Sequence, residues 1–504
     1  MSDGKATGLD QVDNNLLKLA ADHIARPLCY IINLSLTTSV YPTAWKRAKV
    51  VPLAKSATAR LSGPNSRPIS LLPAFSKVME KVVSSQISDY FQGNALMTPY
   101  QHAYRKHHST GTALLQLVDD WYCKIDQGNI VGVIFLDFSA AFDLVDHSHL
   151  LQKLICYGFS DTAVGWMGSY LAGRKQCVHF NGTNSTFREI QCGVPQGSCL
   201  GPLLFTIFTN DLPLTVTETT PAMYADDTSA YACAPSVDTV TVKLQTDMNN
   251  ICEWVRLNKL FLNAKKTKCM LIGSKPKMSK KPELTLSADG SPIQQVTTMK
   301  LLGSTLDQCL TWDLHIKEMT KKMARSLGAI RRSAAYLDQS LLKLLTETLT
   351  LTHLDYCTAV WTSTTQKNIN ALQVMQNKAA KLILGSNRIS VREMNCALSW
   401  QTVTERLFTN NMCSFHKILF FKQPSTLHSK LHLVSDQHTY STRSSTRNDF
   451  KLPKPKTTSA TKSFLYRCSK SYNALPYHIR TSVPSTFKIH IRDRVNMDTN
   501  IMIR

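Results

Sequence analysis

The sequence predicts a mixed α+β fold in which an antiparallel sheet is surrounded by helices. Residues Ile130 to Phe138 form a continuous apolar run rich in β-formers, which is typical of a buried central strand. Two alternating segments, 175–194 and 222–233, each contain a turn signal, so each predicts a hairpin. From His315 to about Leu407 nearly every window has the helical period. We therefore expect a sheet followed by a largely helical region.

The N-terminal part of the chain predicts helices around one short extended segment. Apolar residues recur at three- and four-residue spacings from Leu16 to Thr37, with Pro27 as an interruption. The stretch KVVPL, residues 49–53, reads as extended between proline- and serine-rich loops. Helical periods return at 74–91 and at 110–128. These elements precede the predicted central strand.

The segments after the central strand alternate between helices and loops. Residues 139–159 have helical spacing, and the glycine-punctuated stretch from Gly193 to Gly201 opens into an apolar helix. Another helix is expected near 240–257, followed by a lysine-rich loop at 274–282. No repeat of fixed length appears, which argues against a solenoid.

The chain carries a large positive charge. Its 504 residues include 58 Lys and Arg against 35 Asp and Glu, a formal net charge of +23. Such an excess favours a polyanionic partner such as nucleic acid, with a merely solubilising surface charge as the alternative. The excess is concentrated in residues 401–504, which hold 17 Lys and Arg against 5 Asp and Glu. We expect this C-terminal region to be basic and partly disordered.

Cysteine usage and the N-terminus indicate the cellular compartment. The 14 cysteines are scattered without zinc-site spacing, which fits reduced thiols. The N-terminus lacks the basic and apolar regions of a signal peptide, and no apolar run approaches the roughly 18 residues of a membrane helix. We expect an intracellular protein of the cytoplasm, the nucleus or both, with no membrane partner. The oligomeric state has no signature in the sequence.

Three aspartates carry the strongest chemical signal. Asp137 ends the predicted central strand, and Asp226 and Asp227 lie side by side at the turn of the second hairpin. Taken singly, Asp137 could be a helix N-cap and the pair an ordinary aspartate-rich turn. If strand end and turn meet, the carboxylates form a hard-oxygen site suited to two Mg²⁺ ions. Two such ions, roughly 4 Å apart, would activate a 3′-hydroxyl and stabilise a departing pyrophosphate.

The order of the motifs resembles that of a known enzyme family. LDFSAAFDLVDHSHLLQKL, GVPQGSCLGPLLFTIFTNDLP, MYADDTSAYA, LNAKKTKCMLIG and KLLGSTLDQCLTW resemble the successive palm motifs of non-LTR (LINE-type) retrotransposon reverse transcriptases. Upstream, VVPLAK, SRPISLLPAFSKVMEKVV and YQHAYRKHHSTGTALLQLVDD look like the fingers motifs of that family. The likeness covers most of residues 5–407. Group II intron and telomerase enzymes fit these motifs less well.

The resemblance implies a right-hand polymerase and its reaction. The expected parts are an N-terminal helical lead-in (1–45), fingers and palm (46–314), a helical thumb or connection (315–408) and a basic C-terminal region (409–504). The implied activity is RNA-directed DNA synthesis by a nucleotidyltransferase, with an RNA template, a DNA primer and dNTPs as partners. The implied cofactor is Mg²⁺, as two ions, with Mn²⁺ as a substitute.

The resemblance also implies roles for the aspartates and their neighbours. Asp137 matches the first metal-binding aspartate, and Asp226 and Asp227 match the catalytic pair. The backbone carbonyl of Phe138 is an implied further metal ligand next to the dNTP. Phe142 matches the bulky residue that excludes a 2′-hydroxyl, although plain core packing is the alternative.

Further positions match dNTP-binding motifs. Gln196 and Gly197 match residues that line the incoming dNTP and the template base, in a loop that also serves as a glycine turn. Lys266 matches the motif lysine near the pyrophosphate, where a cation would neutralise charge or donate a proton. Lys265 and Lys268 lie close enough in sequence to compete for that role, and a solvated basic loop is the alternative.

Cations of the fingers and a turn near the primer complete the implied site. Lys55, Arg67 and Arg105 fall in fingers motifs, where they would grip the triphosphate. Leu302 and Gly303 match the turn that seats the primer end. In the expected thumb, basic residues would track a duplex backbone or simply form a solvated helix face; they are Lys321, Lys322, Arg325, Arg331 and Arg332.

The chain departs from the family pattern in three respects. The endonuclease that usually precedes this polymerase is not found, and no zinc knuckle follows the expected thumb. Tyr472, in the tail motif YNALPYHIR, lies where tryptophan is common in the family. We therefore expect a truncated or relic copy, and a catalytically inactive nucleic-acid-binding remnant is the alternative function.

Overall fold

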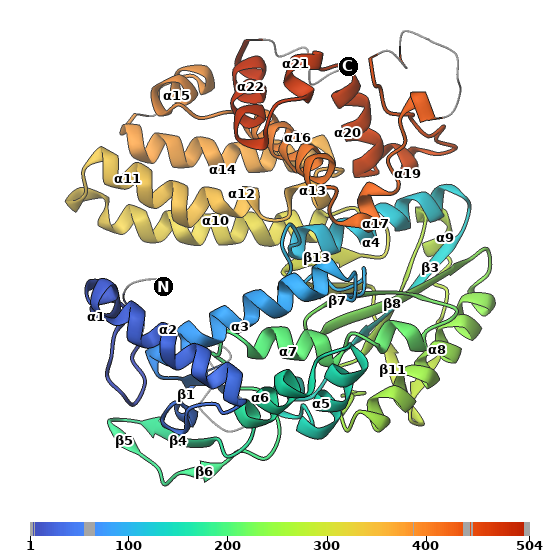
Figure 1. The fold of residues 1–504 in the computed structure, drawn as a ribbon. Coiled ribbons are helices and arrows are strands. Elements are labelled where there is room, and N and C mark those ends of the chain that lie inside the picture. Colours follow the sequence, from blue (N-terminus) through green and yellow to red (C-terminus); the bar gives the residue numbers. More distant parts are fainter. Residues whose placement is uncertain are drawn as a thin grey trace.

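The core of the molecule is a six-stranded sheet with helices on both faces. The computed structural model describes residues 4, 6–54, 66–386, 388–436, 444 and 447–497. The strand order is β10–β11–β9–β3–β8–β7, and each neighbouring pair is antiparallel except β11 and β9. The strands are β3 (Ile130–Leu136), β7 (Thr220–Tyr224), β8 (Asp227–Ala234), β9 (Lys268–Ile272), β10 (Leu286–Ala288) and β11 (Ser291–Gln295). The predicted mixed α+β architecture is confirmed (Figure 1).

The central strand β3 is buried on both faces. Its side chains alternate between two cores, because successive residues of a strand point to opposite sides of a sheet. Val131 and Val133 pack in the same core as α4 (Thr110–Asp126). Ile134 and Leu136 pack in the core that contains α7 (Gly201–Phe208) and α8 (Val237–Leu257). This double burial explains the continuous apolar run in the sequence.

A glycine in β3 permits the close approach of α8. A Cβ atom placed on Gly132 would lie 2.3 Å from Val240 Cγ1 and 2.7 Å from Leu244 Cδ1. Gly132→Ala is therefore expected to destabilise the fold by about 1–3 kcal/mol through overpacking. Chemical denaturation of the variant and the parent measures this difference. Equal denaturation midpoints would show that α8 moves to make room for the added methyl group without loss of stability.

A second, smaller sheet lies beside the N-terminal helices. Its strands follow the order β2–β1–β4–β5, with β6 also paired to β4, and they are β1 (Arg47–Ala54), β2 (Ser66–Leu71), β4 (Lys175–Phe180), β5 (Thr183–Asn184) and β6 (Arg188–Glu189). Asn181 and Gly182 have φ of 48° and 79°, as expected for a two-residue hairpin turn. The hairpin predicted at 175–194 is thus confirmed.

Two helical predictions need correction. The helix expected from Leu16 to Thr37 is broken at Ala20 rather than at Pro27, which lies inside the second of the two helices. Residues 139–159 do not form one helix, because Ala140 has φ of 48° and the Asp146 side chain caps a new helix start. The elements are α1 (Asn14–Leu19), α2 (Ala21–Thr38), η1 (Thr43–Lys46), α3 (Ala74–Gly93), η3 (Ala141–Asp143), α5 (His147–Cys156) and α6 (Asp161–Leu171).

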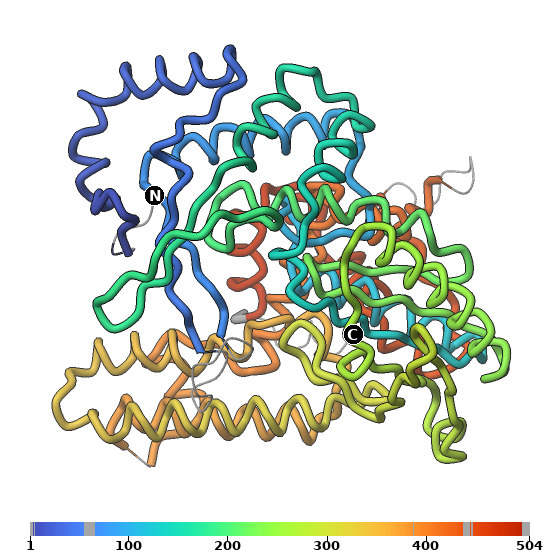
Figure 2. The backbone as a smooth tube through the Cα atoms, turned by 90° about the horizontal axis from the view of Figure 1, so that it is seen from below, coloured from blue at the N-terminus to red at the C-terminus, as the bar shows by residue number. Residues whose placement is uncertain are grey.

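The region after the sheet is helical, as predicted. It begins after the hairpin of β12 (Thr298–Leu301) and β13 (Ser304–Asp307). Its elements are α10 (Asp313–Ser333), η5 (Ala334–Tyr336), α11 (Gln339–Thr346), η6 (Glu347–Leu351), α12 (Thr352–Asp355), α13 (Thr358–Trp361), α14 (Gln366–Leu384), α15 (Val391–Leu398) and α16 (Val403–Phe421). The long helices α10 and α14 lie side by side as an arm of the molecule (Figure 2).

The C-terminal helices pack onto this helical region and onto α4 (Figure 1). They are α17 (Ser425–His428), η7 (Val434–Asp436), α19 (Thr458–Thr461), α20 (Phe464–Asn473), α21 (Tyr477–Arg480) and α22 (Pro484–Met497). Phe464, Tyr472 and Phe487 are buried in the same core as α4. The described part of 409–504 is therefore folded into the body of the protein.

Two shorter elements lie elsewhere in the chain. The 3-10 turn η4 (Leu212–Thr215) follows α7, and the short helix α9 (Lys275–Met278) lies in the lysine-rich segment that was expected to be a loop. Among the described residues, no helix is both long and apolar enough to cross a membrane.

Candidate active site

The three aspartates meet at one edge of the large sheet. Leu136 of β3 is paired with Thr228 of β8, so Asp137 directly follows β3 beside Asp227 at the start of β8. Tyr224 pairs with Asp227 across a tight turn that holds Asp226. The sheet register therefore brings together carboxylates that lie far apart in the sequence.

A strained residue and a buried amide shape the turn. Ala225 has φ of 56°, a conformation that residues with a Cβ seldom adopt. Its N–H donates to Oε1 of Gln101 at 3.0 Å, and Gln101 is fully buried. Sequence reasoning missed Gln101, because nothing in its local pattern distinguishes it from a loop residue. Its role is to hold the turn that presents Asp226 and Asp227.

Burial and mutual repulsion raise the pKa values of Asp226 and Asp227. Loss of hydration, then the charges of Asp226 and Asp137, raise the pKa of Asp227 to about 6. The pKa of Asp226 is also raised by loss of hydration and by Asp137, while the charge of Arg67 acts in the opposite direction. A cation bound beside Asp226 and Asp227 would favour the ionised form of both carboxylates, because an opposite charge offsets their repulsion.

One lysine lies next to this carboxylate cluster. The Nζ atom of Lys266 is 3.8 Å from Oδ2 of Asp137. Lys268 instead donates to the Lys265 carbonyl at 2.6 Å and to Oε1 of Gln294 at 2.8 Å. Among the three lysines considered from the sequence, the structure thus places Lys266 beside the aspartates. Because its side chain is mostly exposed, this ion pair contributes little to stability.

The donor set suits magnesium with the help of substrate. Among the residues that the structure describes, no group of three or more His, Cys, Asp or Glu is arranged to hold a metal ion. Mg²⁺, however, is commonly held by one or two carboxylates, with water and substrate phosphates as the remaining ligands. Paired carboxylates of raised pKa fit that partial coordination. The Phe138 carbonyl stays a predicted ligand.

The glycine-rich loop, residues 193–201, is anchored against β2 and η3. Ser70 N–H donates to the Gln196 carbonyl at 2.7 Å, and Gln196 Nε2 donates to Oδ1 of Asp143 at 2.8 Å. Gly197 has φ of 126°, and a Cβ there would lie 2.4 Å from the Ser70 carbonyl oxygen. Only glycine fits this backbone. The turn role expected from the sequence is confirmed, while the dNTP role stays a prediction.

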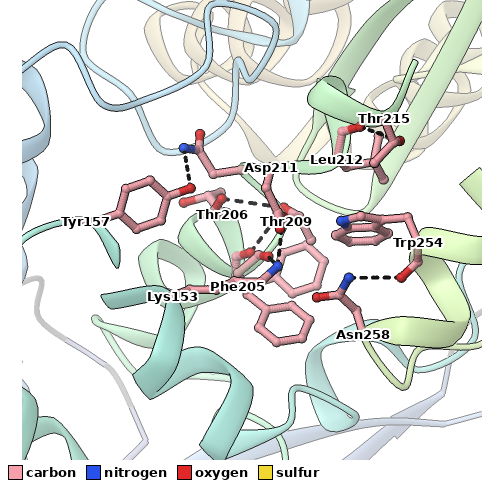
Figure 3. Close-up of polar contacts among 12 residues, drawn as sticks. Lys153, Tyr157, Phe205, Thr206, Thr209, Asp211, Leu212, Thr215, Trp254 and Asn258 are labelled. Atoms are coloured by element: carbon pink, nitrogen blue, oxygen red, sulfur yellow. Dashed lines mark hydrogen bonds and ion pairs between the residues drawn. The ribbon is translucent and has the colours of Figure 1, made fainter. Parts of the chain in front are cut away.

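Phe142 lies next to α7. Its ring stacks on Phe205 with centroids 4.2 Å apart and an angle of 23° between planes, and it is half-buried. Figure 3 shows how the C-terminal end of α7 is held: Lys153 Nζ donates to the Phe208 carbonyl at 2.6 Å and pairs with Asp211 at 2.7 Å. A cation at a helix C-terminus stabilises that end. Phe142 thus stacks on a helix whose C-terminal end is held by Lys153.

The fingers cations have different environments. Arg67 is exposed on β2, and its positive charge acts to lower the pKa of Asp226. Arg105 donates through one guanidinium nitrogen to the carbonyls of Thr98 at 2.7 Å and Gln101 at 2.9 Å. This geometry favours a role in holding the 98–105 loop, and triphosphate binding by Arg105 stays a prediction. Lys55 lies outside the described residues.

The turn at Leu302 and Gly303 is pinned by the helical region. Both residues have positive φ, 43° and 79°, in the two-residue connection of β12 and β13. The Tyr356 hydroxyl donates to the Leu302 carbonyl at 2.7 Å and is hydrogen-bonded to Thr110 Oγ1 at 3.2 Å. Tyr356 therefore ties this turn to the start of α4. Seating of the primer end by the turn stays a prediction.

The basic residues of α10 lie on its exposed face. Lys321, Lys322, Arg325, Arg331 and Arg332 are all exposed. Met319, Met323 and Leu327, on the opposite side of the helix, are buried in the core. This arrangement fits both interpretations made from the sequence, a solvated face and a surface for a nucleic-acid backbone.

Comparison with known proteins agrees with the motif order. Residues 61–306 match the family model described as reverse transcriptase (RNA-dependent DNA polymerase). The chain is 28% identical over 393 residues to a probable RNA-directed DNA polymerase from transposon BS of Drosophila melanogaster, covering 75% of this chain and 43% of that protein. It is 27% identical over 416 residues to the RNA-directed DNA polymerase from mobile element jockey of Drosophila funebris, covering 80% and 45%.

The solved structures add little to this. An apo telomerase from Candida tropicalis, truncated from its C-terminal domain, overlaps 54% of this chain and 55% of its own at 13% identity and a TM-score of 0.36, too low to support an argument. The chain spans less than half the length of the two curated relatives described above. In its motif order and in these sequence matches, the chain is similar to the reverse transcriptases of non-LTR retrotransposons.

Proposed function

We propose that this chain is an RNA-directed DNA polymerase that extends a primer 3′-hydroxyl on an RNA template. The observation that carries the proposal is the meeting of Asp137 with Asp226 and Asp227 at one sheet edge, with the pKa of Asp227 raised to about 6. Adjacent carboxylates with raised pKa values are costly for a fold, and a divalent cation offsets their repulsion.

Each neighbouring residue has a proposed part in the reaction. When bound, two Mg²⁺ ions supply Lewis-acid stabilisation of the attacking and leaving oxygens. Asp137, Asp226 and Asp227 hold the ions, and Lys266 neutralises charge on the departing pyrophosphate. Arg67 faces the triphosphate, and Gln196 with Gly197 lines the incoming dNTP. Leu302 and Gly303 seat the primer end.

The proposed right hand divides the chain by function. Residues 1–45 lead into fingers and palm at 46–314, and residues 315–408 form the thumb or connection. Residues 409–504 are proposed to support the palm, because their described part shares a core with α4. The basic face of α10 is the proposed track for the template–primer duplex, which makes binding salt-sensitive.

Primer extension with oligo(dT) on poly(rA) tests the activity. We expect product that depends on Mg²⁺ and dNTPs, and Mn²⁺ is expected to substitute for Mg²⁺. Asp226→Asn should abolish synthesis while RNA affinity stays nearly unchanged, because the exposed basic residues remain. Well-folded protein that yields no metal-dependent product would sink the polymerase proposal and leave the inactive, nucleic-acid-binding remnant.

Phe142 is proposed to select deoxynucleotides. Because Phe205 supports its ring at 4.2 Å, the ring cannot easily retreat from a 2′-hydroxyl. Phe142→Val is expected to raise incorporation of rNTPs relative to dNTPs by at least about tenfold, since the clash that discriminates is removed. Competing single-nucleotide extension reactions measure this ratio. An unchanged ratio in a variant with normal thermal stability would assign Phe142 to core packing alone.

A further inference from the structure

A buried carboxylate lies beneath the glycine-rich loop. Glu80 of α3 is fully buried, and its Oε2 accepts the Cys199 N–H at 2.6 Å. Its Oε1 accepts the hydroxyls of Ser76 at 3.1 Å and Tyr170 at 3.2 Å. Ser76 and Glu80 share a helix face with core residues. A charged residue among the apolar residues of that face is the sequence signal that could have pointed to this site.

The surroundings of Glu80 form a built polar network. Arg174 is 2% exposed, and its guanidinium lies 4.8 Å from the Tyr170 ring centroid and 5.9 Å from that of Tyr41. The Tyr41 hydroxyl is hydrogen-bonded to Ser76 Oγ at 2.8 Å. Burial raises the pKa of Glu80, while the charge of Arg174 acts to lower it.

Such a network is poorly explained by stability alone. A buried charge is expensive, and well-packed apolar side chains of similar volume often stabilise a protein at least as well. Glu80 nevertheless directs one carboxylate oxygen at a main-chain N–H of the loop rather than at Arg174. This choice of partner indicates that the carboxylate holds backbone geometry.

The loop is held from three sides, and Glu80 provides the third. Ser70 of β2 binds the Gln196 carbonyl at 2.7 Å and leaves no room for a Cβ on Gly197. Asp143 accepts from the Gln196 side chain at 2.8 Å. The Cys199 N–H bond to Glu80 lies two residues beyond Gly197. Without it, the segment after Gly197 loses its only hydrogen bond to α3 among those seen in the described residues.

We propose that Glu80 is a positioning residue that fixes the 196–199 backbone and thereby sets the affinity of the polymerase for dNTPs. The inference rests on the proposed function, because it assigns the dNTP to the loop. Glu80 does not touch substrate. It acts through Cys199 on Gly197 and Gln196, so its loss is expected to weaken nucleotide binding more than the chemical step.

Steady-state primer extension with Glu80→Ala and Glu80→Gln tests the proposal. Glu80→Ala should raise KM for dNTP about tenfold, equivalent to ~1.4 kcal/mol, with kcat changed less than about twofold. Glu80→Gln should largely restore KM, because its amide oxygen can accept the Cys199 N–H while the rotatable Ser76 and Tyr170 hydroxyls accept from its NH₂. If Glu80→Ala does not fold, Glu80→Met fills the volume without restoring a carboxylate.

Asp247→Ala is the matched control. Asp247 is also buried, at 1% exposure, and accepts main-chain N–H groups of Thr217, Glu218 and Thr219, away from the glycine-rich loop. It should lower the melting temperature without raising KM. The proposal is overturned if Glu80→Ala behaves like Asp247→Ala, with lower stability and unchanged KM.

Hydrogen exchange separates this inference from the proposed function. In Glu80→Ala, the amides of residues 196–200 should exchange faster than in the parent, while those of β3 should not. This result is expected even if the parent makes no DNA, in which case only the polymerase proposal fails. Unchanged exchange in 196–200 would show that Glu80 does not hold the loop.

Discussion

Replacing Asp227 by Asn is expected to abolish primer extension and, at neutral pH without metal, to raise the melting temperature. The carboxylate is lost from the proposed metal site, so synthesis should fall by several orders of magnitude. The same change removes a charge whose loss of hydration, together with repulsion by Asp226 and Asp137, raises the pKa of Asp227 from 3.8 to about 6. Function and stability therefore oppose each other at this residue.

The stability gain has a defined pH window. The folded protein binds the Asp227 proton more tightly than the unfolded chain does, so the parent is relatively most stable below the ordinary pKa of 3.8 and loses this stability as pH rises through about 6. The melting temperature of Asp227→Asn should match the parent near pH 4 and exceed it near pH 7. Thermal unfolding in EDTA measures both.

Magnesium provides the matching control for this experiment. Adding Mg²⁺ at pH 7 should stabilise the parent more than Asp227→Asn, because binding to the folded state shifts unfolding by mass action. Equal melting temperatures of parent and variant at pH 7 would contradict the electrostatic argument. Retained synthesis by the variant would contradict the catalytic one.

Deletion of residues 442–504 is expected to prevent cooperative folding of the whole chain. The deletion removes buried side chains from the core shared with α4, namely Phe450, Phe464, Tyr472, Phe487 and Ile491. Each contributes about 1.5–3 kcal/mol, so their sum rivals the roughly 5–15 kcal/mol stability of an ordinary domain. Insoluble protein, or circular dichroism without a cooperative melt, is the expected result.

A buried aspartate of α4 adds to this effect. Asp119 is 2% exposed and accepts Ser463 Oγ at 2.6 Å and Leu465 N–H at 3.1 Å. The deletion would leave this carboxyl without both donors. Deletion of residues 498–504 alone removes none of these groups and is the control. A 442–504 deletion that melts within a few degrees of the parent would show that the C-terminal helices are dispensable.

Any RNA-binding role of the tail is better tested by substituting exposed Lys451, Lys454 and Lys456.

Local patterns in the sequence were sufficient for several elements. The apolar run at Ile130 predicted the central strand, and Asn181 with Gly182 predicted a hairpin, because burial and turn geometry leave direct traces in residue type. The prediction of a break at Pro27 was wrong: α2 continues through this proline, although Pro27 cannot donate an N–H to the carbonyl one turn earlier. The fold of the C-terminal region, residues 409–504, was harder to predict, because its core residues are widely spaced within a mostly polar sequence.

The sequence by itself indicated the similarity to reverse transcriptases, the three aspartates and the turn that carries two of them, because motif order and residue type can be read without a structure. Only the tertiary structure decided that Lys266 rather than Lys268 lies beside Asp137, that Arg105 holds a loop, and that Glu80 reaches Cys199. These outcomes depend on which backbone groups sheet register and helix packing bring within hydrogen-bonding distance, and such long-range contacts leave no periodic trace in a single sequence.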